Sequence, residues 1–365
     1  MLGLFVAAMV QAAPAFPQSI ERLVRLAPGP GARDNPDALA TPDGVAVVWE
    51  EVRDGRSLLL LGGTDATRST ASAPRALVGG WGNQWGPSIA TRGDTTWLAC
   101  YVADRSLPTG DRDVMVVRYR GSFAAPLDTI RITRDPAGAA LPVNDASPTL
   151  VLSEGKPALL AWSAGAFHAD RPAARAYEDK NILAAEVRGL APSRRRALTT
   201  GKERGREMSP ALARWGPPGP ERYLLAYLSQ VGDGPYALKL ALFDGGWRRR
   251  STRVIARSTR GIAHPSLLLL SGVPYLSWVD NTTTDVTIAR LDRSLRVSAR
   301  ISLRNALRST GFAAYGPALA GLSGARLFDD AGRLGVTFVA TMEYQPAAGN
   351  VRQEVFLAWL SGTRP

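Results

Sequence analysis

The segment Ala263-His264-Pro265-Ser266-Leu267-Leu268 begins the pattern that decides the fold of this chain. Two further apolar runs follow it, Tyr275-Leu276-Ser277-Trp278-Val279-Asp280 and Asp285-Val286-Thr287-Ile288-Ala289-Arg290-Leu291. A proline opens the first run, an aromatic residue lies near the end of the second, and an acidic residue starts the third. Short runs rich in Val, Ile, Leu and aromatic residues, bounded by Gly, Pro, Asp and Asn, predict β-strands.

The same pattern occurs six times along the chain, at a period of roughly fifty to sixty residues. The opening prolines are Pro36, Pro87, Pro148, Pro210, Pro265 and Pro317, and the aromatic residues are Trp49, Tyr101, Trp162, Tyr227, Trp278 and Phe338. A fourth run ends most copies, as at 129–133 and 251–255. Four strands per copy predict an all-β fold, a six-bladed β-propeller with four antiparallel strands per blade. The alternatives are a β-sandwich, whose strands lack such a period, and an open β-solenoid, whose repeats are shorter.

The sixth copy supplies only three runs. The segment Ile20-Glu21-Arg22-Leu23-Val24-Arg25-Leu26 precedes the first copy and mixes apolar and basic residues as the fourth runs do. We expect this N-terminal strand to pair with residues 354–360 and to complete the last blade, because an open ring would leave two sheet faces uncovered. Residues 19–365 are therefore predicted to form a single six-bladed β-propeller domain.

Residues 1–18 differ from the rest of the chain. They carry no charge, residues 2–10 are apolar, and Ala13-Pro14-Ala15 resembles a small-residue cleavage site. This pattern predicts a signal peptide-like segment and a secreted or periplasmic protein. The alternative is a membrane anchor, for which the apolar core is short. The rest of the sequence contains no segment that could span a bilayer.

The chain has a formal net charge of +12, and all its basic residues except Lys156, Lys180, Lys202 and Lys239 are arginines. The basic runs 194–196 and 248–250 fall at the starts of predicted outermost strands, where charge discourages edge-to-edge pairing. We therefore expect no nucleic-acid partner, which would need basic residues gathered on one face with interleaved aromatics. Attraction to an anionic polysaccharide, or to a membrane surface without spanning, is the alternative. We expect a monomer.

The sequence resembles the sialidase-like, six-bladed extracellular propellers. The resemblance rests on Val48-Trp49-Glu50-Glu51-Val52-Arg53-Asp54-Gly55 and on the two similar stretches that start at Tyr101 and Trp278, each leading into a third strand. It covers most of the chain and implies a fold more than an activity. The Asp-box of that family, Ser-x-Asp-x-Gly-x-x-Trp, is absent, and Asp244-Gly245-Gly246-Trp247 retains only part of it. The N-terminal arginine motif of true sialidases is also absent.

Ligands of propellers usually enter at the face that carries the loops after the second strands. Four acidic residues lie just beyond second strands, Glu51, Asp104, Asp280 and Glu343, and His168 lies in the longest of these loops. Glycoside hydrolysis needs two carboxyls, or a tyrosine nucleophile and a carboxylate, across a substrate. Asp104, Asp280 and Glu343 are therefore the catalytic candidates if the protein is a hydrolase, and their possible partners are Tyr344 and Tyr177-Glu178. The alternative is that these acids cap turns or pair with neighbouring arginines.

Trp81 and Trp85, in Gly79-Gly80-Trp81-Gly82-Asn83-Gln84-Trp85, could offer flat faces for a sugar or a protein partner. The alternative is that they plug the end of the ring. Cys100 is the only cysteine and lies in an apolar run, which predicts a small buried residue.

With two histidines in distant copies and no phosphate-binding or dinucleotide motif, we expect no metal and no cofactor. The sequence thus favours an exported binding module for a carbohydrate or protein ligand, with Trp81, Trp85, Glu51, Asp104, His168, Asp280 and Glu343 as its candidate site. The alternatives are a sialidase-like glycoside hydrolase acting on extracellular glycans and a structural component of the cell envelope.

Overall fold

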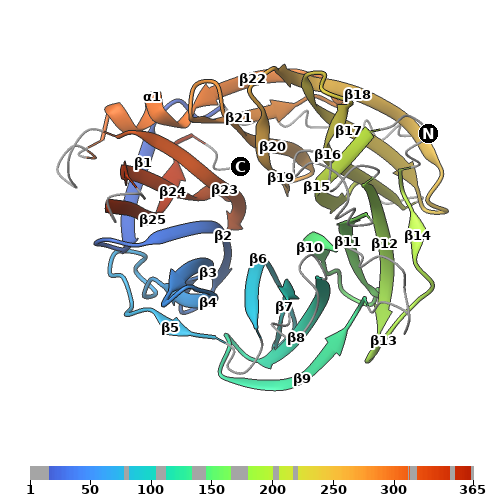
Figure 1. The fold of residues 1–365 in the computed structure, drawn as a ribbon, viewed down its shortest axis with the longest axis horizontal. Helices are drawn as coiled ribbons and strands as arrows, with labels where there is room; N and C mark the ends of the chain where they lie inside the picture. Colours follow the sequence, from blue (N-terminus) through green and yellow to red (C-terminus); the bar gives the residue numbers. More distant parts are fainter. Residues whose placement is uncertain are drawn as a thin grey trace, which may run out of the picture.

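This computed structural model describes residues 16–77, 82–103, 112–133, 145–165, 180–199, 205–216, 221–310, 312, 319–345 and 350–362. Within these residues six antiparallel sheets surround a common axis, as the sequence predicts (Figure 1). Every sheet begins with an inner strand beside the axis, and the next two strands of the chain follow it outward as hairpins. The six sheets are called blades 1 to 6 below.

The first three blades follow one another directly along the chain. Blade 1 consists of β2 (Ala32–Thr41), β3 (Gly44–Arg53), β4 (Arg56–Gly63) and β5 (Arg75–Ala76). Blade 2 consists of β6 (Asn83–Arg92), β7 (Thr95–Ala103), β8 (Asp113–Arg120) and β9 (Ala125–Arg131). Blade 3 consists of β10 (Ala146–Val151), β11 (Ala158–Ala164) and β12 (Asn181–Arg188), with the outer pieces β13 (Ala191–Pro192) and β14 (Arg196–Ala197) both paired to β12.

The other three blades complete the ring. Blade 4 consists of β15 (Gly205–Arg214), β16 (Arg222–Val231), β17 (Tyr236–Asp244) and β18 (Arg249–Ser258). Blade 5 consists of β19 (Ile262–Leu270), β20 (Val273–Asp280), β21 (Asp285–Leu291) and β22 (Val297–Ser302), followed by the short helix α1 (Leu303–Arg308). Blade 6 consists of β23 (Gly321–Asp330), β24 (Arg333–Gln345) and β25 (Asn350–Leu360), with β1 (Ile20–Ala27) outermost. No helix of the described chain has the length and apolar character needed to cross a membrane.

The N-terminal strand closes the ring as predicted. β1 pairs antiparallel with β25, with Leu23 opposite Ala358 and Val24 opposite Leu357. Beside this pair Glu354 is fully buried and accepts a hydrogen bond from Arg25 at 2.6 Å. Next to it, Ser361 N donates to Ser19 O at 3.0 Å. The two ends of the described chain therefore form one sheet.

The prediction that a proline opens each inner strand is wrong in detail, because the prolines lie inside these strands. Pro36, for example, is the fifth residue of β2, and the pairing register of β2 with β3 shifts between Asp34 and Asp37. The same shift occurs at the prolines of β6, β10, β15 and β19. A β-bulge leaves one residue without a ladder partner, so the missing N–H of proline costs little there.

Blade 6 departs from the predicted pattern. Its inner strand shows the same shift between Ser323 and Arg326, where Gly324-Ala325 replaces the residue-plus-proline pair. The predicted opening residue, Pro317, lies outside the described residues. Because the bulge needs a residue that tolerates positive φ, and not the proline itself, the inner strand of the sixth copy lies several residues later than predicted, whereas its second and third strands lie where predicted.

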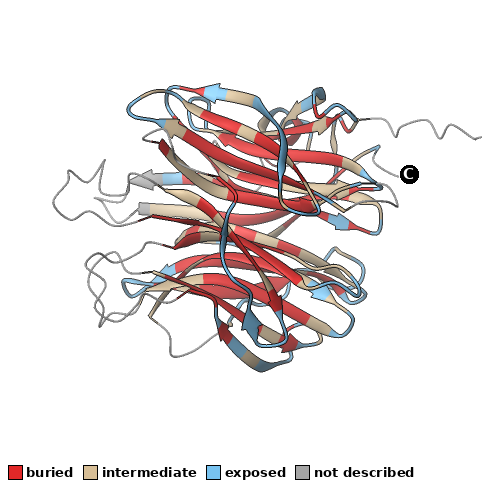
Figure 2. Ribbon diagram, turned by 90° about the vertical axis from the view of Figure 1, so that its right-hand side faces the viewer, coloured by how far each residue is buried: buried red, intermediate tan, exposed pale blue. Residues whose placement is uncertain are grey.

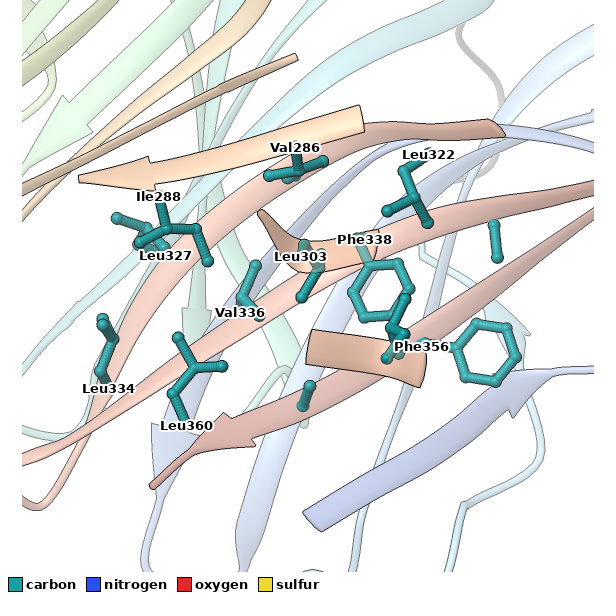
Figure 3. Packing of buried hydrophobic residues seen from close by; sticks show 14 of the residues in the cluster. Val286, Ile288, Leu303, Leu322, Leu327, Leu334, Val336, Phe338, Phe356 and Leu360 are labelled. Atoms are coloured by element: carbon teal, nitrogen blue, oxygen red, sulfur yellow. The ribbon is translucent and has the colours of Figure 1, made fainter. Parts of the chain in front are cut away.

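The apolar core is divided into six clusters, each between two neighbouring blades. Buried residues follow the middle of the strands, whereas exposed residues gather at strand ends and turns (Figure 2). Between blades 5 and 6, Val286 and Ile288 of β21 lie near Val336 and Phe338 of β24, and α1 adds Leu303 (Figure 3). Because every cluster is shared, each blade depends on its neighbours for its stability.

Candidate functional site

The inner strands bring six equivalent residues to the same level around the axis. These bulge residues all have positive φ, and they are Asn35, Gly86, Ser147, Ser209, His264 and Gly324. They lie toward the end of the ring where the second strand of each blade finishes, which is called the loop-rich face below. The bulges therefore fix six comparable positions where side chains from different blades can approach each other.

The residue before each bulge residue pairs across the sheet with one residue of the second strand. The residue types in these pairs distinguish blades 1 and 2 from the other four blades. Blade 1 has Asp34 opposite Glu50, and blade 2 has Trp85 opposite Tyr101. In the other blades the pairs are Ala146 with Ser163, Met208 with Leu228, Ala263 with Val279 and Ser323 with Val339. Charge and aromatic surface are thus concentrated on two adjacent blades.

Glu50 is held in an unusual protonation state for a glutamate. The side chain is buried, and its Oε1 accepts hydrogen bonds from Asn35 Nδ2 at 2.7 Å and from the backbone N–H of Gly86. Burial, and then the nearby negative charge of Asp34, raise the pKa of Glu50 to about 8. Glu50 therefore links blade 1 to the bulge of blade 2 and is largely protonated at neutral pH.

The aromatic pair of blade 2 carries an arginine. The rings of Trp85 and Tyr101 are stacked with centroids 5.5 Å apart, and the guanidinium carbon of Arg112 lies 4.9 Å from the Trp85 centroid and 5.6 Å from that of Tyr101. Trp85, Tyr101 and Arg112 are all partly exposed. The ring of Tyr101 packs where a side chain on Gly86 would be, so this bulge requires glycine both for space and for its φ of 58°. The three residues form a cationic aromatic platform.

The side chain of Asp34 in blade 1 lies close to that of His264, two blades away around the ring. Its side chain is 41% exposed, and Oδ2 lies 4.0 Å from Nε2 of His264 in blade 5. The contact passes over blade 6, where a side chain on Gly324 would come within 2.9 Å of Asp34 Oδ1. Gly324 therefore leaves the space that lets blades 1 and 5 approach each other at the axis.

Positive charge continues from the platform toward blade 4. Burial, followed by the charges of Arg112 and Arg206, lowers the pKa of Lys180 to about 8. Burial raises the pKa of Asp145 in the same region to about 6. The loop-rich face thus carries the carboxyl groups of Asp34 and Glu50 over blade 1 and the cationic groups of Arg112, Lys180 and Arg206 over blades 2 to 4.

The predicted site residues fall into three groups. Trp85 lies in the platform. Glu51 accepts hydrogen bonds from Arg33 and Arg53, both at 2.8 Å, and from Trp49. Burial alone would raise the pKa of Glu51, but these hydrogen bonds outweigh it and hold the pKa below its ordinary value. Since Arg33 also donates to the carbonyl oxygen of Gln353 at 2.6 Å, Glu51 belongs to the junction between blades 1 and 6 and not to a ligand site.

The two remaining acids that the structure describes, Asp280 and Glu343, have separate partners. Asp280 caps the turn after β20, where its Oδ1 accepts a hydrogen bond from the N–H of Thr282 at 2.8 Å. Glu343 is exposed in β24 and lies opposite Arg352 in the pairing with β25. Trp81, Asp104 and His168 lie outside the described residues. Among the residues that are described, no group of three or more His, Cys, Asp and Glu side chains could hold a metal ion.

Four residues of this face were missed from the sequence: Asp34, Glu50, Tyr101 and Arg112. Asp34 and Trp85 occupy the same position, two residues before the blade proline, so this position was a usable signal. The sequence pattern aligns Tyr101 with the core aromatic residues of the other blades. In the structure Cys100 occupies the position of those core aromatics, and Tyr101 lies one residue later, beside the bulge. Cys100 itself is fully buried, as predicted.

Comparison with solved structures identifies the same architecture elsewhere. An α-L-arabinofuranosidase from Fusarium graminearum superposes with a TM-score of 0.60 at 12% identity, covering 92% of this chain and 98% of that one. A subtype N10 neuraminidase-like protein from a little yellow-shouldered bat isolate superposes with a TM-score of 0.53 at 12% identity, covering 94% and 99%. This chain has the six-bladed propeller fold of the sialidase-like proteins.

A further neuraminidase-like protein of subtype N11, from a flat-faced bat isolate, superposes on this propeller with a TM-score of 0.52 at 10% identity, covering 97% and 98%. No family model matches the sequence, and no curated protein sequence matches it. At these identities the likeness is one of fold, and the chemistry of this propeller has to be argued from its own residues.

Proposed function

We propose that this protein is an exported carbohydrate-binding propeller whose ligand lies on the loop-rich face over blades 1 and 2. The observation that carries the proposal is the platform of Trp85, Tyr101 and Arg112 next to the exposed carboxylate of Asp34. Apolar faces of sugars stack on aromatic rings, and charged or polar groups beside the rings fix the hydroxyls. The likeness in fold to an arabinofuranosidase agrees with a sugar ligand. Export rests on the signal peptide-like pattern of residues 1–18.

The positions of the two carboxyls, Asp34 and Glu50, favour binding over hydrolysis. A glycosidase needs two carboxyls that reach the scissile bond from opposite sides. Asp34 and Glu50 are opposite each other in one sheet, and Glu50 is buried with two donors on Oε1. In this arrangement Glu50 positions the bulge of blade 2 and does not face a ligand.

The test is binding of the mature chain to an array of neutral and acidic oligosaccharides. Trp85→Ala should weaken binding by at least about tenfold, because a central aromatic anchor typically contributes 2 kcal/mol or more. Trp247→Ala is the matched control. Trp247 is also partly exposed, stacks on Tyr223 with centroids 4.1 Å apart and has Arg196 within 6.0 Å, but it lies on the outer part of the ring. Equal loss in both variants, or none in Trp85→Ala, would contradict the proposal.

A glycoside hydrolase is the second candidate, because the raised pKa of Glu50 suits a general acid at neutral pH and a second carboxyl, that of Asp34, lies opposite it in the sheet. Its test is separate. If the protein were a hydrolase, the parent would turn over a glycoside in a broad screen, and Asp34→Asn and Glu50→Gln would each reduce turnover by orders of magnitude. We expect no turnover; a glycoside that the parent cleaves and both variants do not would establish the hydrolase.

A further inference from the structure

A groove runs along the outside of the ring between blades 4 and 5, away from the platform. It consists of two adjoining hollows of about 390 and 610 Å³, both lined by Ile255 and Val297. One wall is the second half of β18, and the other is β22 with the turn before it. Residues 252–257 span about 17 Å of strand, so the groove is long enough for an extended polymer segment.

Four arginines line the groove, two from each wall: Arg253 and Arg257 from β18, and Arg296 and Arg300 from the β22 side. All four are exposed, and none forms an ion pair within the described residues. The one acidic residue in the lining, Asp280, is engaged in capping its turn. Asp292, near the lower end, likewise accepts hydrogen bonds from the backbone N–H groups of Ser294 and Arg296. Four arginines against one aspartate in the lining leave the groove with a net positive charge.

The groove has an apolar floor. Val254 and Val297 are 45% and 40% exposed, and Ile255 is partly buried against the core cluster that contains Trp278. Both walls carry a β-bulge in the middle of the groove, at Ile255 in β18 and at Ser298 in β22. A bulge bends and twists its strand, so the two edges are held apart and not paired or packed flat.

We propose that this groove binds a chain of an acidic polysaccharide. The sugar units of such a polymer present carboxylates and apolar C–H faces in alternation. These groups match a groove that has arginines on both walls and aliphatic side chains between them. The end of the groove at Arg257 and Asp280 lies at the loop-rich end of the ring, so a bound polymer would lead from the outer edge toward the loop-rich face. The groove binds the polymer independently of what the platform recognises.

Nucleic acid fits less well. Proteins that bind single strands stack bases on exposed aromatic rings, and the one aromatic residue lining the groove, Trp278, is 6% exposed. A lipid surface fits less well because the charges line a concave groove, whereas a flat basic face would lie on a membrane.

The test measures the affinity of the mature chain for polygalacturonate, with the fully methyl-esterified polymer as the uncharged comparison. A variant with Arg253, Arg257, Arg296 and Arg300 all changed to Gln should bind polygalacturonate at least about tenfold more weakly. Its matched control changes Arg56, Arg120, Arg222 and Arg308 to Gln, which removes the same charge from exposed positions elsewhere and should leave the affinity unchanged. Hydrogen exchange should show protection by the polymer confined to residues 252–257 and 295–300.

Three results would overturn the proposal: equal weakening in both quadruple variants, equal affinity for the esterified polymer, or tighter binding of duplex DNA or phosphatidylglycerol vesicles than of polygalacturonate. Trp85→Ala should leave polygalacturonate binding in the groove intact, so failure of the platform and failure of the groove are separate outcomes.

Discussion

Glu50 shows how one buried side chain can tie stability to pH. The folded ring raises its pKa from 4.5 to about 8, so between these values the folded protein binds a proton that the unfolded chain does not. Stability contributed by this group is fully present below about pH 4.5 and is lost as the pH rises through 8. Burial likewise raises the pKa values of Asp37 and Asp145 to about 6. The stability that these two carboxyls contribute is therefore already lost at about pH 6, below the range in which Glu50 ionises.

We therefore predict that Glu50→Gln flattens the dependence of unfolding free energy on pH between about 6 and 8. Gln keeps an acceptor for Asn35 and Gly86 but cannot ionise. The measurement is chemical denaturation at a series of pH values, with Asp280→Asn, in an exposed turn, as the control. A slope that is the same in Glu50→Gln and in the parent would show that Glu50 is not the group that titrates.

Cys100 gives a second prediction at this scale. It is fully buried, and burial, followed by the charge of Glu50, raises the pKa of its thiol to about 12. Because only the thiolate reacts readily, iodoacetamide should not modify the folded protein at pH 8 and should modify it fully once it is unfolded. Mass spectrometry of the native and denatured protein measures this, and rapid modification of the native protein would mean that the inter-blade cluster opens.

At the scale of the element, the bulged inner strands carry a repeated link between blades. The residue after the blade proline accepts a hydrogen bond from a backbone N–H of the next blade: Asp37 from Ile89, Ser88 from Leu150, Thr149 from Leu212 and Ser266 from Leu327. In blade 4 this position is Ala211. In blades 1, 2, 3 and 5 the residue after the blade proline is thus also the connection between inner strands.

We predict that Ser88→Ala lowers the unfolding free energy by about 1–2 kcal/mol, because the buried N–H of Leu150 loses its acceptor. Ser294→Ala, in an exposed turn, is the control and should change stability by less than about 0.5 kcal/mol. Urea titrations of both variants measure the difference. Equal stability of Ser88→Ala and the parent would mean that Leu150 N–H finds another partner.

The same elements explain how far the sequence could be interpreted. Prolines and apolar runs identified all six blades, since the bulge and the strands depend on local residue types. The inner strand of blade 6 was misplaced because Gly324-Ala325 provides its bulge without a proline. Trp85 was found as an aromatic in a glycine-rich stretch, whereas the approach of Arg112 to it and of His264 to Asp34 depends on packing between distant segments, which no local pattern encodes.

At the scale of the whole molecule, stability depends on closing the ring. Deleting residues 20–26 would remove most of β1, expose the edge of β25 and leave Glu354 without its contact to Arg25. We predict a marked drop in the thermal midpoint or in solubility, because neighbouring blades stabilise each other and an open edge promotes aggregation. A synthetic peptide of residues 19–28 added in trans should restore part of the loss. A deletion variant with the midpoint of the parent would contradict this role of β1.

Ring closure also sets an order of events during synthesis. Blades 1 to 5 are each built from consecutive hairpins and can form as the chain lengthens, but β1 is made first and its partner β25 last. At a synthesis rate of about 5–20 residues per second, β1 waits on the order of tens of seconds for β25. During that time it is an unpaired strand, and in a crowded population of nascent chains it can complete blade 6 of a neighbour instead, which gives a domain-swapped oligomer with every native contact in place.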